Sequence, residues 1–463
     1  MKKIAKFLIV LGMMGQLSSC DYLDIVPDER AQESDTWKTE GAVRGYLYSC
    51  YGYLPANRTF GNSYWLAEEL TAVTKELFTT FKYGYYSPVS LGFTSNTWST
   101  IWNGIHQCYM FQESLKQVSN EYVTDEMKKQ YLAESNFLIA YYHFLSMRSY
   151  GPTMIIRSVI DLETPISGFP ERSSIDEVVA FINEKLDEAM SEGGLPTTWS
   201  GKDYGRATRL AALALKSRVY LYAASPLYNG NTEMYADFRS PLDGRQLIAQ
   251  EKSQAKWEIS ATQTKYAIDE VEKAKFHLYH DADAGEPSDA KPGLPNKAQR
   301  RLRYTNIDNQ TGNNPEIIWA DTRNDDYYGI QRRCPPRQTL GGKFAGISMT
   351  NCPTLQTIEA FYTKNGLPIN KDKTFDYDER YEYISAPENC DGNNYEDLVK
   401  YANFTPSSDK VMRLCTDREP RFYAWTTYHN GYFEFGKYNN EEISADPAKR
   451  AIRIHLLRDD PHG

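Results

Sequence analysis

The feature that most constrains the fold is the stretch from Tyr131 to Pro152, whose apolar residues cover more than one face of a helix. A helix that is apolar on nearly all sides packs against several neighbours rather than one. Ala133 and Ala140 allow another helix to approach closely, and Gly151-Pro152 marks the end because proline cannot continue the hydrogen-bond ladder. The stretch therefore predicts a central helix, in which we interpret Tyr141 and Tyr142 as packing residues.

The segments that follow alternate between two kinds of helical pattern. Ser174 to Glu177 forms a capping box, and the helix that it starts carries apolar residues on one face. Residues 205–224 are again apolar on nearly all sides, and residues 255–275 carry one apolar face, with Trp257, Ala261, Ile268 and Val271. This alternation is what stacked helical hairpins require, although no short fixed repeat period is present.

The regions before and after these helices are more varied. Helices are expected at 37–53 and from residue 97, and the segment 58–96 between them reads as a long structured loop with a short helix around 66–77. Long loops in compact proteins tend to be functional. Beyond residue 306 the pattern becomes short strands separated by turns, notably a strand at 316–320.

The amino terminus has the pattern of a lipoprotein signal peptide. Lys2, Lys3 and Lys6 precede an apolar run that is too short to span a bilayer, and Leu17-Ser18-Ser19-Cys20 matches the bacterial lipobox. We therefore expect cleavage before Cys20 and attachment of acyl chains to its thiol.

Charge limits the classes of partner. Removal of the signal peptide leaves 49 basic residues against 61 acidic ones, a net charge of about −12. This balance argues against nucleic acid and against broad adhesion to anionic lipid. Six further cysteines form an even set that an oxidising compartment can pair in fifteen ways, and their spacing is not that of a zinc site.

Several blocks, taken in order, resemble one family. They are the lipobox followed by LDIVP, AESNFLIAYYHFLSMRSYGP, ERSSIDEVVAFINEKLDEA, GRATRLAALALKSRVYLYAASPLYNG, NPEIIWA, PTLQTIEAFYTKNGLPI and DREPRFYAWTTYHNG. Together they resemble the SusD/RagB family of outer-membrane nutrient-binding lipoproteins. The resemblance implies a mainly α fold of tetratricopeptide-like helical hairpins in a superhelical scaffold, with a loop-rich ligand-binding subdomain. It also implies a SusC-like TonB-dependent transporter as partner.

The resemblance also suggests a division of the chain. We expect a signal peptide at 1–19, a helical N-terminal region at 20–275, a surface loop at 276–305 and a C-terminal region at 306–463. Family members usually continue into another helical pair where this chain stops, so we expect the C-terminal region to be incomplete.

Aromatic residues are the best candidates for ligand contact. The chain has 35 tyrosines and 8 tryptophans, and pyranose faces stack on aromatic rings while their hydroxyls bond amides and guanidinium groups. Trp98, Trp102 and Trp319 are expected in the core. The candidates lie in three loop clusters: Asn62, Tyr64 and Trp65; Tyr83, Tyr85 and Tyr86; and Tyr327, Tyr328 and Arg332.

The sequence thus predicts a noncatalytic, lipid-anchored protein of the outer membrane, facing the cell exterior, that captures a glycan and passes it to the transporter. Capture of a peptide or glycopeptide is the alternative within the family; a glycoside hydrolase and a purely structural scaffold are alternatives outside it. We find no GxSxG, HExxH or GxxxxGK[ST] motif. No cofactor or metal is expected, and the acidic run from Asp321 to Asp326 is interpreted as a solvated turn rather than a calcium site.

Overall fold

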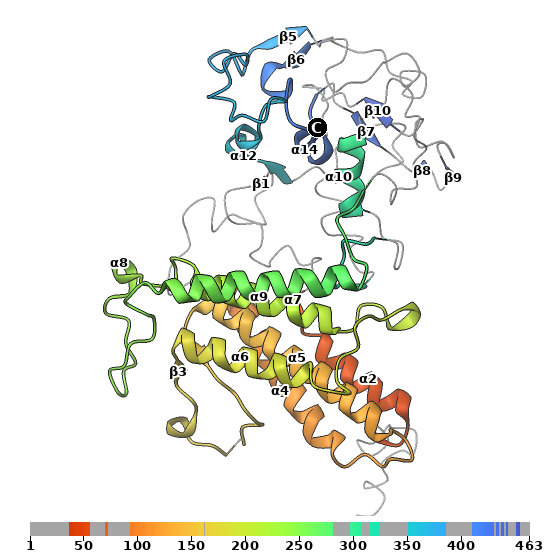
Figure 1. Ribbon diagram of the computed structural model, residues 1–463, viewed down its shortest axis with the longest axis vertical. Coiled ribbons are helices and arrows are strands. Elements are labelled where there is room, and N and C mark those ends of the chain that lie inside the picture. Colours follow the sequence, from red (N-terminus) through yellow and green to blue (C-terminus); the bar gives the residue numbers. More distant parts are fainter. Residues whose placement is uncertain are drawn as a thin grey trace, which may run out of the picture.

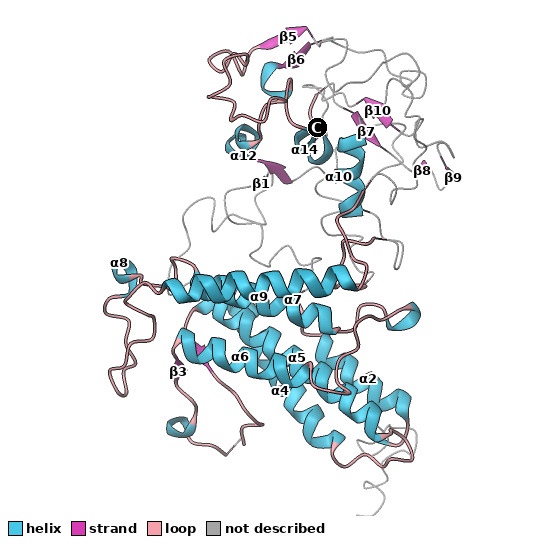
Figure 2. Cartoon of the chain, in the orientation of Figure 1, coloured by secondary structure: helices cyan, strands magenta, loops and turns pink. Residues whose placement is uncertain are grey.

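The computed structural model describes residues 37–55, 70–72, 93–161, 163–280, 297–307, 314–323, 351–385 and 410–429, and the short strands at 432–434, 437–438, 441–442 and 451–453. In this part of the chain, a helical unit is built from the N-terminal residues and a smaller unit of short helices and strands from the later ones (Figure 1). Coloured by secondary structure, the first unit is almost entirely helical (Figure 2).

The helical unit is a series of helices in which each packs against the next. They are α2 (Glu40–Tyr51), α4 (Phe93–Leu115), α5 (Asp125–Tyr150), α6 (Ile175–Ala189), α7 (Arg209–Ala224) and α9 (Gln254–Lys273). Contacts join α2 to α4, α4 to α5, α5 to α6, α6 to α7 and α7 to α9. The predicted scaffold of tetratricopeptide-like hairpins is confirmed.

Helix α5 is the centre of this unit, as the sequence predicts. It begins earlier than expected, where the Thr124 side chain caps the amide of Met127, and it ends at Gly151, whose φ of 70° favours glycine. Residues 133–140 and 142–147 are all buried. Tyr142 is a core residue as expected, whereas Tyr141 is only half-buried.

The capping and stop signals in the sequence predicted the positions of α6 and α7 correctly. The Ser174 hydroxyl accepts from the Glu177 amide at 3.3 Å, and the Glu177 carboxylate accepts from the Ser174 amide at 2.7 Å. This is the predicted capping box. Helix α7 starts at the Thr208 cap and stops at Ser225.

The buried face of α9 differs from the predicted one. Ser260 and Ala267 face α7, whereas Ala261 and Ile268, which we expected inside, are exposed. The hydroxyls of Ser217 and Thr264 are hydrogen bonded at 2.7 Å across the α7–α9 contact. Small residues therefore allow the close approach, and of the larger apolar residues expected inside, Val271 packs against Leu210 and Leu213 whereas Ile268 lies outside the contact.

Three further sequence-based expectations are wrong. Leu70–Ala72 is a strand, β1, within the segment expected to be a short helix, because it pairs antiparallel with β4 (Asn351–Pro353). Residues 316–320 are not a strand; a turn between Asn314 and Ile317 instead directs them onto the helical core. Lys297–Ile307 forms helix α10, where the surface loop was expected to reach residue 305.

Smaller elements connect the helices. Strands β2 (Thr153–Met154) and β3 (Arg172–Ser173) pair as a hairpin after α5. The remaining connections contain η3 (Ile166–Gly168), η4 (Gly201–Asp203) and α8 (Thr232–Tyr235).

The second unit is organised around Arg418, which is 2% exposed. Its guanidinium donates to the carbonyls of Ile358, Phe361, Tyr362 and Leu414, at distances of 2.6–3.3 Å. The unit's other elements are α12 (Leu355–Ala360), β5 (Tyr383–Ser385), β6 (Lys410–Met412), η6 (Arg413–Cys415), α14 (Pro420–Trp425), β7 (Tyr432–Glu434), β8 (Lys437–Tyr438), β9 (Glu441–Glu442) and β10 (Ala451–Arg453). The strands pair as β5–β6, β7–β10 and β8–β9.

Within the described ranges, no helix is both long enough and apolar enough to cross a membrane.

Candidate functional site

All the site residues predicted from the sequence lie outside the described residues. This holds for the lipidation site Cys20 and for the three loop clusters of Asn62, Tyr64 and Trp65; Tyr83, Tyr85 and Tyr86; and Tyr327, Tyr328 and Arg332. These assignments therefore stay predictions.

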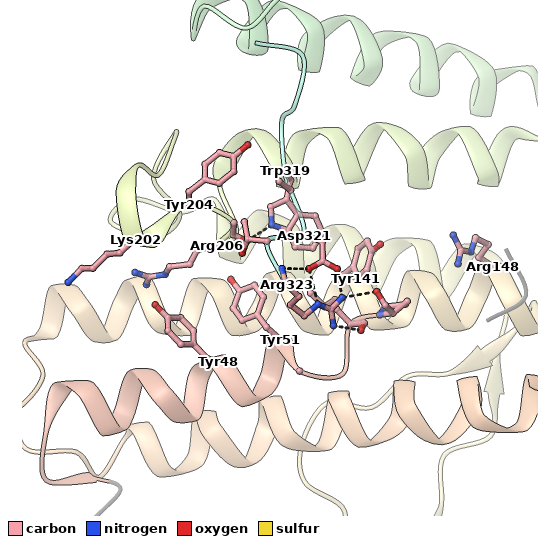
Figure 3. Close-up of a pocket in the computed structure, with 16 residues that line it drawn as sticks. Tyr48, Tyr51, Tyr141, Arg148, Lys202, Tyr204, Arg206, Trp319, Asp321 and Arg323 are labelled. Carbon is pink, nitrogen blue, oxygen red and sulfur yellow. Dashed lines mark hydrogen bonds and ion pairs between the residues drawn. The ribbon is translucent and has the colours of Figure 1, made fainter. Parts of the chain in front are cut away.

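The described residues form a different candidate site, a pocket of about 610 Å³ on the helical unit. It lies between the end of α2, the middle of α5, the η4 segment and residues 319–323 (Figure 3). Tyr48 and Tyr51 project from α2 toward the loop that carries Tyr204 and Arg206, and Trp319, Tyr141, Asp321 and Arg323 lie further along. The other lining residues are Gly52, Leu54, Pro55, Arg148, Lys202, Gly205, Ala320 and Thr322.

A buried ion pair supports one wall of this pocket. Arg206 contacts both carboxylate oxygens of Glu134, at 2.5 and 3.2 Å, and its third nitrogen lies 2.8 Å from Asp203. Glu134 is fully buried on α5, and Arg206 is 8% exposed. Burial raises the pKa of the Glu134 carboxyl, whereas Arg206 acts to lower it. The two-point contact with a permanently charged guanidinium identifies this as an ion pair.

Tyr51 and Trp199 complete the surroundings of the pair. The Tyr51 hydroxyl donates to Glu134 at 2.6 Å and accepts from the Ala207 amide at 2.9 Å. The Arg206 guanidinium also lies 4.1 Å from the centre of the Trp199 ring. The network therefore fixes α2 and the loop before α7 to the central helix, and with them the pocket residues that they carry.

Residues 319–323 form a second wall, which is joined to the first through Gly205. The Trp319 indole N–H donates to the Gly205 carbonyl at 2.8 Å, and its ring packs edge-on against Tyr141 and Phe137 at 5.4 and 5.1 Å. Gly205 has a φ of 99°, and a Cβ there would meet the Thr322 side chain at 2.9 Å. Trp319 is thus partly the core residue that we expected and partly a pocket residue.

Arg323 closes the pocket against the end of α2. It donates to the carbonyls of Leu54 and Pro55, at 2.9 and 2.8 Å, and pairs with Asp321. Burial acts to raise the pKa of the Asp321 carboxyl, but the hydrogen bonds from Arg323 outweigh it and hold the pKa below its usual range. Asp321 is therefore engaged by Arg323, and among the described residues no group of three or more potential metal ligands occurs.

The chemistry of the pocket suits a polyhydroxylated ligand. Aromatic faces offer stacking surfaces, and phenol, guanidinium, ammonium and carboxylate groups offer donors and acceptors for hydroxyls.

The sequence did not reveal this pocket, because its residues come from segments assigned to packing or to ordinary connections. The one available signal was the loop SGKDYGRAT before α7, in which charged and aromatic residues are grouped between glycines.

Comparison with known proteins gives two family matches. Residues 21–221 match the SusD-like family described as "Starch-binding associating with outer membrane", and residues 315–452 match the SusD family.

Solved structures of similar proteins agree with these family matches. The structure of BT4246 superposes with a TM-score of 0.67 at 29% identity, covering 86% of this chain and 66% of that one. A SusD-like protein from Bacteroides fragilis NCTC 9343, BF3747, superposes with a TM-score of 0.60 at 19% identity, which supports the fold alone, and covers 92% of this chain and 65% of that one. The chain thus spans about two thirds of each of these proteins. No curated protein matches it.

Proposed function

Because the chain belongs to the SusD/RagB family, and residues 21–221 match the SusD-like model described as "Starch-binding associating with outer membrane", we propose that it captures a glycan at the cell surface. The observation that carries this proposal is the pocket between α2, α5 and residues 319–323, with its tyrosines, Trp319 and several cationic groups. The protein binds its glycan without chemical conversion and hands it to a SusC-like TonB-dependent transporter.

Attachment to the membrane follows from the lipobox. In this proposal Cys20 carries the acyl chains, and the protein faces the cell exterior. The aromatic loop clusters around Tyr64, Tyr85 and Tyr328 supply additional contacts to longer glycans.

Calorimetry on a soluble form that starts at Asp21 tests the glycan proposal. A panel of neutral and acidic oligosaccharides is titrated, and the tightest ligand is then measured with Tyr48→Ala. Tyr48 is 40% exposed on α2 and lines the pocket. Because an aromatic contact is worth about 0.5–1.5 kcal/mol, we expect affinity to fall roughly two- to twelvefold.

Tyr122→Ala is the matched control, since Tyr122 is 36% exposed and does not line the pocket. Equal affinities in both variants would place the ligand elsewhere, and loss of binding in a Tyr83, Tyr85 and Tyr86 triple alanine variant would then assign it to the loops. Binding of peptides with no response to any oligosaccharide would favour the peptide alternative. Turnover of an oligosaccharide, abolished by one Asp or Glu substitution, would favour a hydrolase.

A further inference from the structure

Two cysteines on neighbouring helices of the helical unit have no role in the pocket chemistry. Cys50 lies in the last turn of α2 and Cys108 in α4, and both are fully buried. Both are free thiols in this structure. The helices pack against each other, and the residues next to the two cysteines are hydrogen bonded across this contact, where the Gln107 side-chain amide donates to the Ser49 hydroxyl at 2.9 Å.

Side chains of α5 hydrogen bond to the backbone carbonyls of both cysteines. The Tyr142 hydroxyl of α5 donates to the Cys50 carbonyl at 2.6 Å, and the Ser135 hydroxyl donates to the Cys108 carbonyl at 3.2 Å. A disulfide requires the backbones of the two cysteines to approach closely, and the hydrogen bond between Ser49 and Gln107 shows that α2 and α4 do so at this level. Among the described cysteines, Cys352 and Cys415 belong to the second unit.

We propose that Cys50 and Cys108 are joined by a disulfide bond in the exported protein, tying α2 to α4 behind the pocket. The proposal rests on the proposed function in one respect, since a surface protein folds outside the reducing cytoplasm. The bond holds the wall that carries Tyr48 and Tyr51. It closes a covalent loop of about 58 residues, a length for which a cross-link removes considerable freedom from the unfolded chain.

The reaction is an exchange with an external disulfide, such as oxidised glutathione. One protein thiolate attacks that disulfide and releases a small thiol, giving a mixed disulfide, and the second thiolate then attacks the protein sulfur and releases the other small thiol. The protein loses two electrons and two protons, and the external disulfide is reduced to two thiols. Burial raises the pKa of the Cys108 thiol well above its ordinary value, so the attacking thiolate is scarce once α2 and α4 have packed.

Peptide mapping tests the bond directly. Reduced, unfolded protein from Asp21 onward is refolded in a glutathione redox buffer, alkylated under denaturing conditions without reductant and cut with trypsin. We expect residues 45–58, which contain Cys50, to be linked to residues 83–116, which contain Cys108. Recovery of both peptides with alkylated thiols would overturn the proposal.

A second measurement separates this bond from the remaining cysteines. Reductant should lower the melting temperature of the wild-type protein by roughly 5–10 °C more than that of the Cys50→Ala, Cys108→Ala double variant. Equal shifts would contradict the disulfide. Glycan titration is independent of both results: linked peptides without glycan binding would refute only the proposed function, and glycan binding with free thiols would refute only the disulfide.

Discussion

Replacement of Arg206 by methionine tests whether the buried ion pair supports the pocket. The substitution leaves the fully buried Glu134 carboxylate with the Tyr51 hydroxyl but without its two-point guanidinium partner. Loss of one member of a buried pair typically costs about 3–5 kcal/mol, because the remaining charge stays away from water. For a unit of this size that corresponds to a melting temperature lower by about 10 °C. Urea titration followed by the helical circular dichroism signal measures the free energy of unfolding.

Arg157→Met is the matched control. Arg157 also makes a two-point contact with a glutamate, Glu184, at 2.8 and 3.2 Å, but these side chains are 58% and 44% exposed. An exposed pair contributes only about 0–1 kcal/mol, so the two variants differ mainly in burial. Equal destabilisation by both substitutions, or a loss below about 1 kcal/mol in Arg206→Met, would refute the reasoning.

The pH dependence of Arg206→Met provides a second check. Burial already raises the pKa of Glu134 above the ordinary 4.5, and removal of the guanidinium raises it further. The folded state of the variant then binds a proton at higher pH than the unfolded state. Its deficit relative to wild type is therefore largest above the variant's folded pKa and shrinks as the pH falls through that pKa toward 4.5. If the stability difference between Arg206→Met and wild type did not change between pH 7 and 5, an unpaired Glu134 carboxylate could not be its cause.

Three further predictions concern stability. Burial lowers the pKa of His143 to about 4 from 6.5, so the free energy of unfolding should fall by about 3 kcal/mol as the pH drops from 6.5 to 4, as measured by urea titration. Arg418→Met removes the guanidinium that donates to four carbonyls, of which Tyr362 keeps the Glu419 amide as a donor, so hydrogen exchange should increase across residues 351–385 and 410–429 but not in α5. Ser174→Ala removes the capping box and should cost about 1 kcal/mol in the same urea assay.

Each of these three has its own control. His143→Gln should lose the additional pH dependence, and a pH profile that is unchanged from wild type would contradict the assignment to this histidine. Faster hydrogen exchange in both units of the Arg418→Met variant would show general unfolding rather than a local loss of the hydrogen bonds that Arg418 makes in the second unit. Ser191→Ala, at the other end of α6, removes a hydroxyl that donates only to the Glu188 carbonyl and should have a smaller effect than Ser174→Ala.

Much of the helical unit was predictable because its signals are local. The apolar residues of α5 follow one another within a few turns, and the capping box at Ser174 involves residues three apart. The buried face of α9 was not predictable in the same way, since close packing against α7 favours Ser260 and Ala267 over larger apolar residues such as Ile268. Hydrophobicity alone therefore indicated the helix but not its contact face.

The sequence by itself determined the class of scaffold, the central helix and the family resemblance, since periodicity, caps and ordered blocks are properties of neighbouring residues. Only the tertiary structure decided the pocket. Arg206 meets Glu134 across 72 residues, and Arg323 reaches the Leu54 carbonyl across 269. Such contacts depend on how helices pack, and that packing places Trp319, which we expected in the core, together with Tyr51 in the walls of a site.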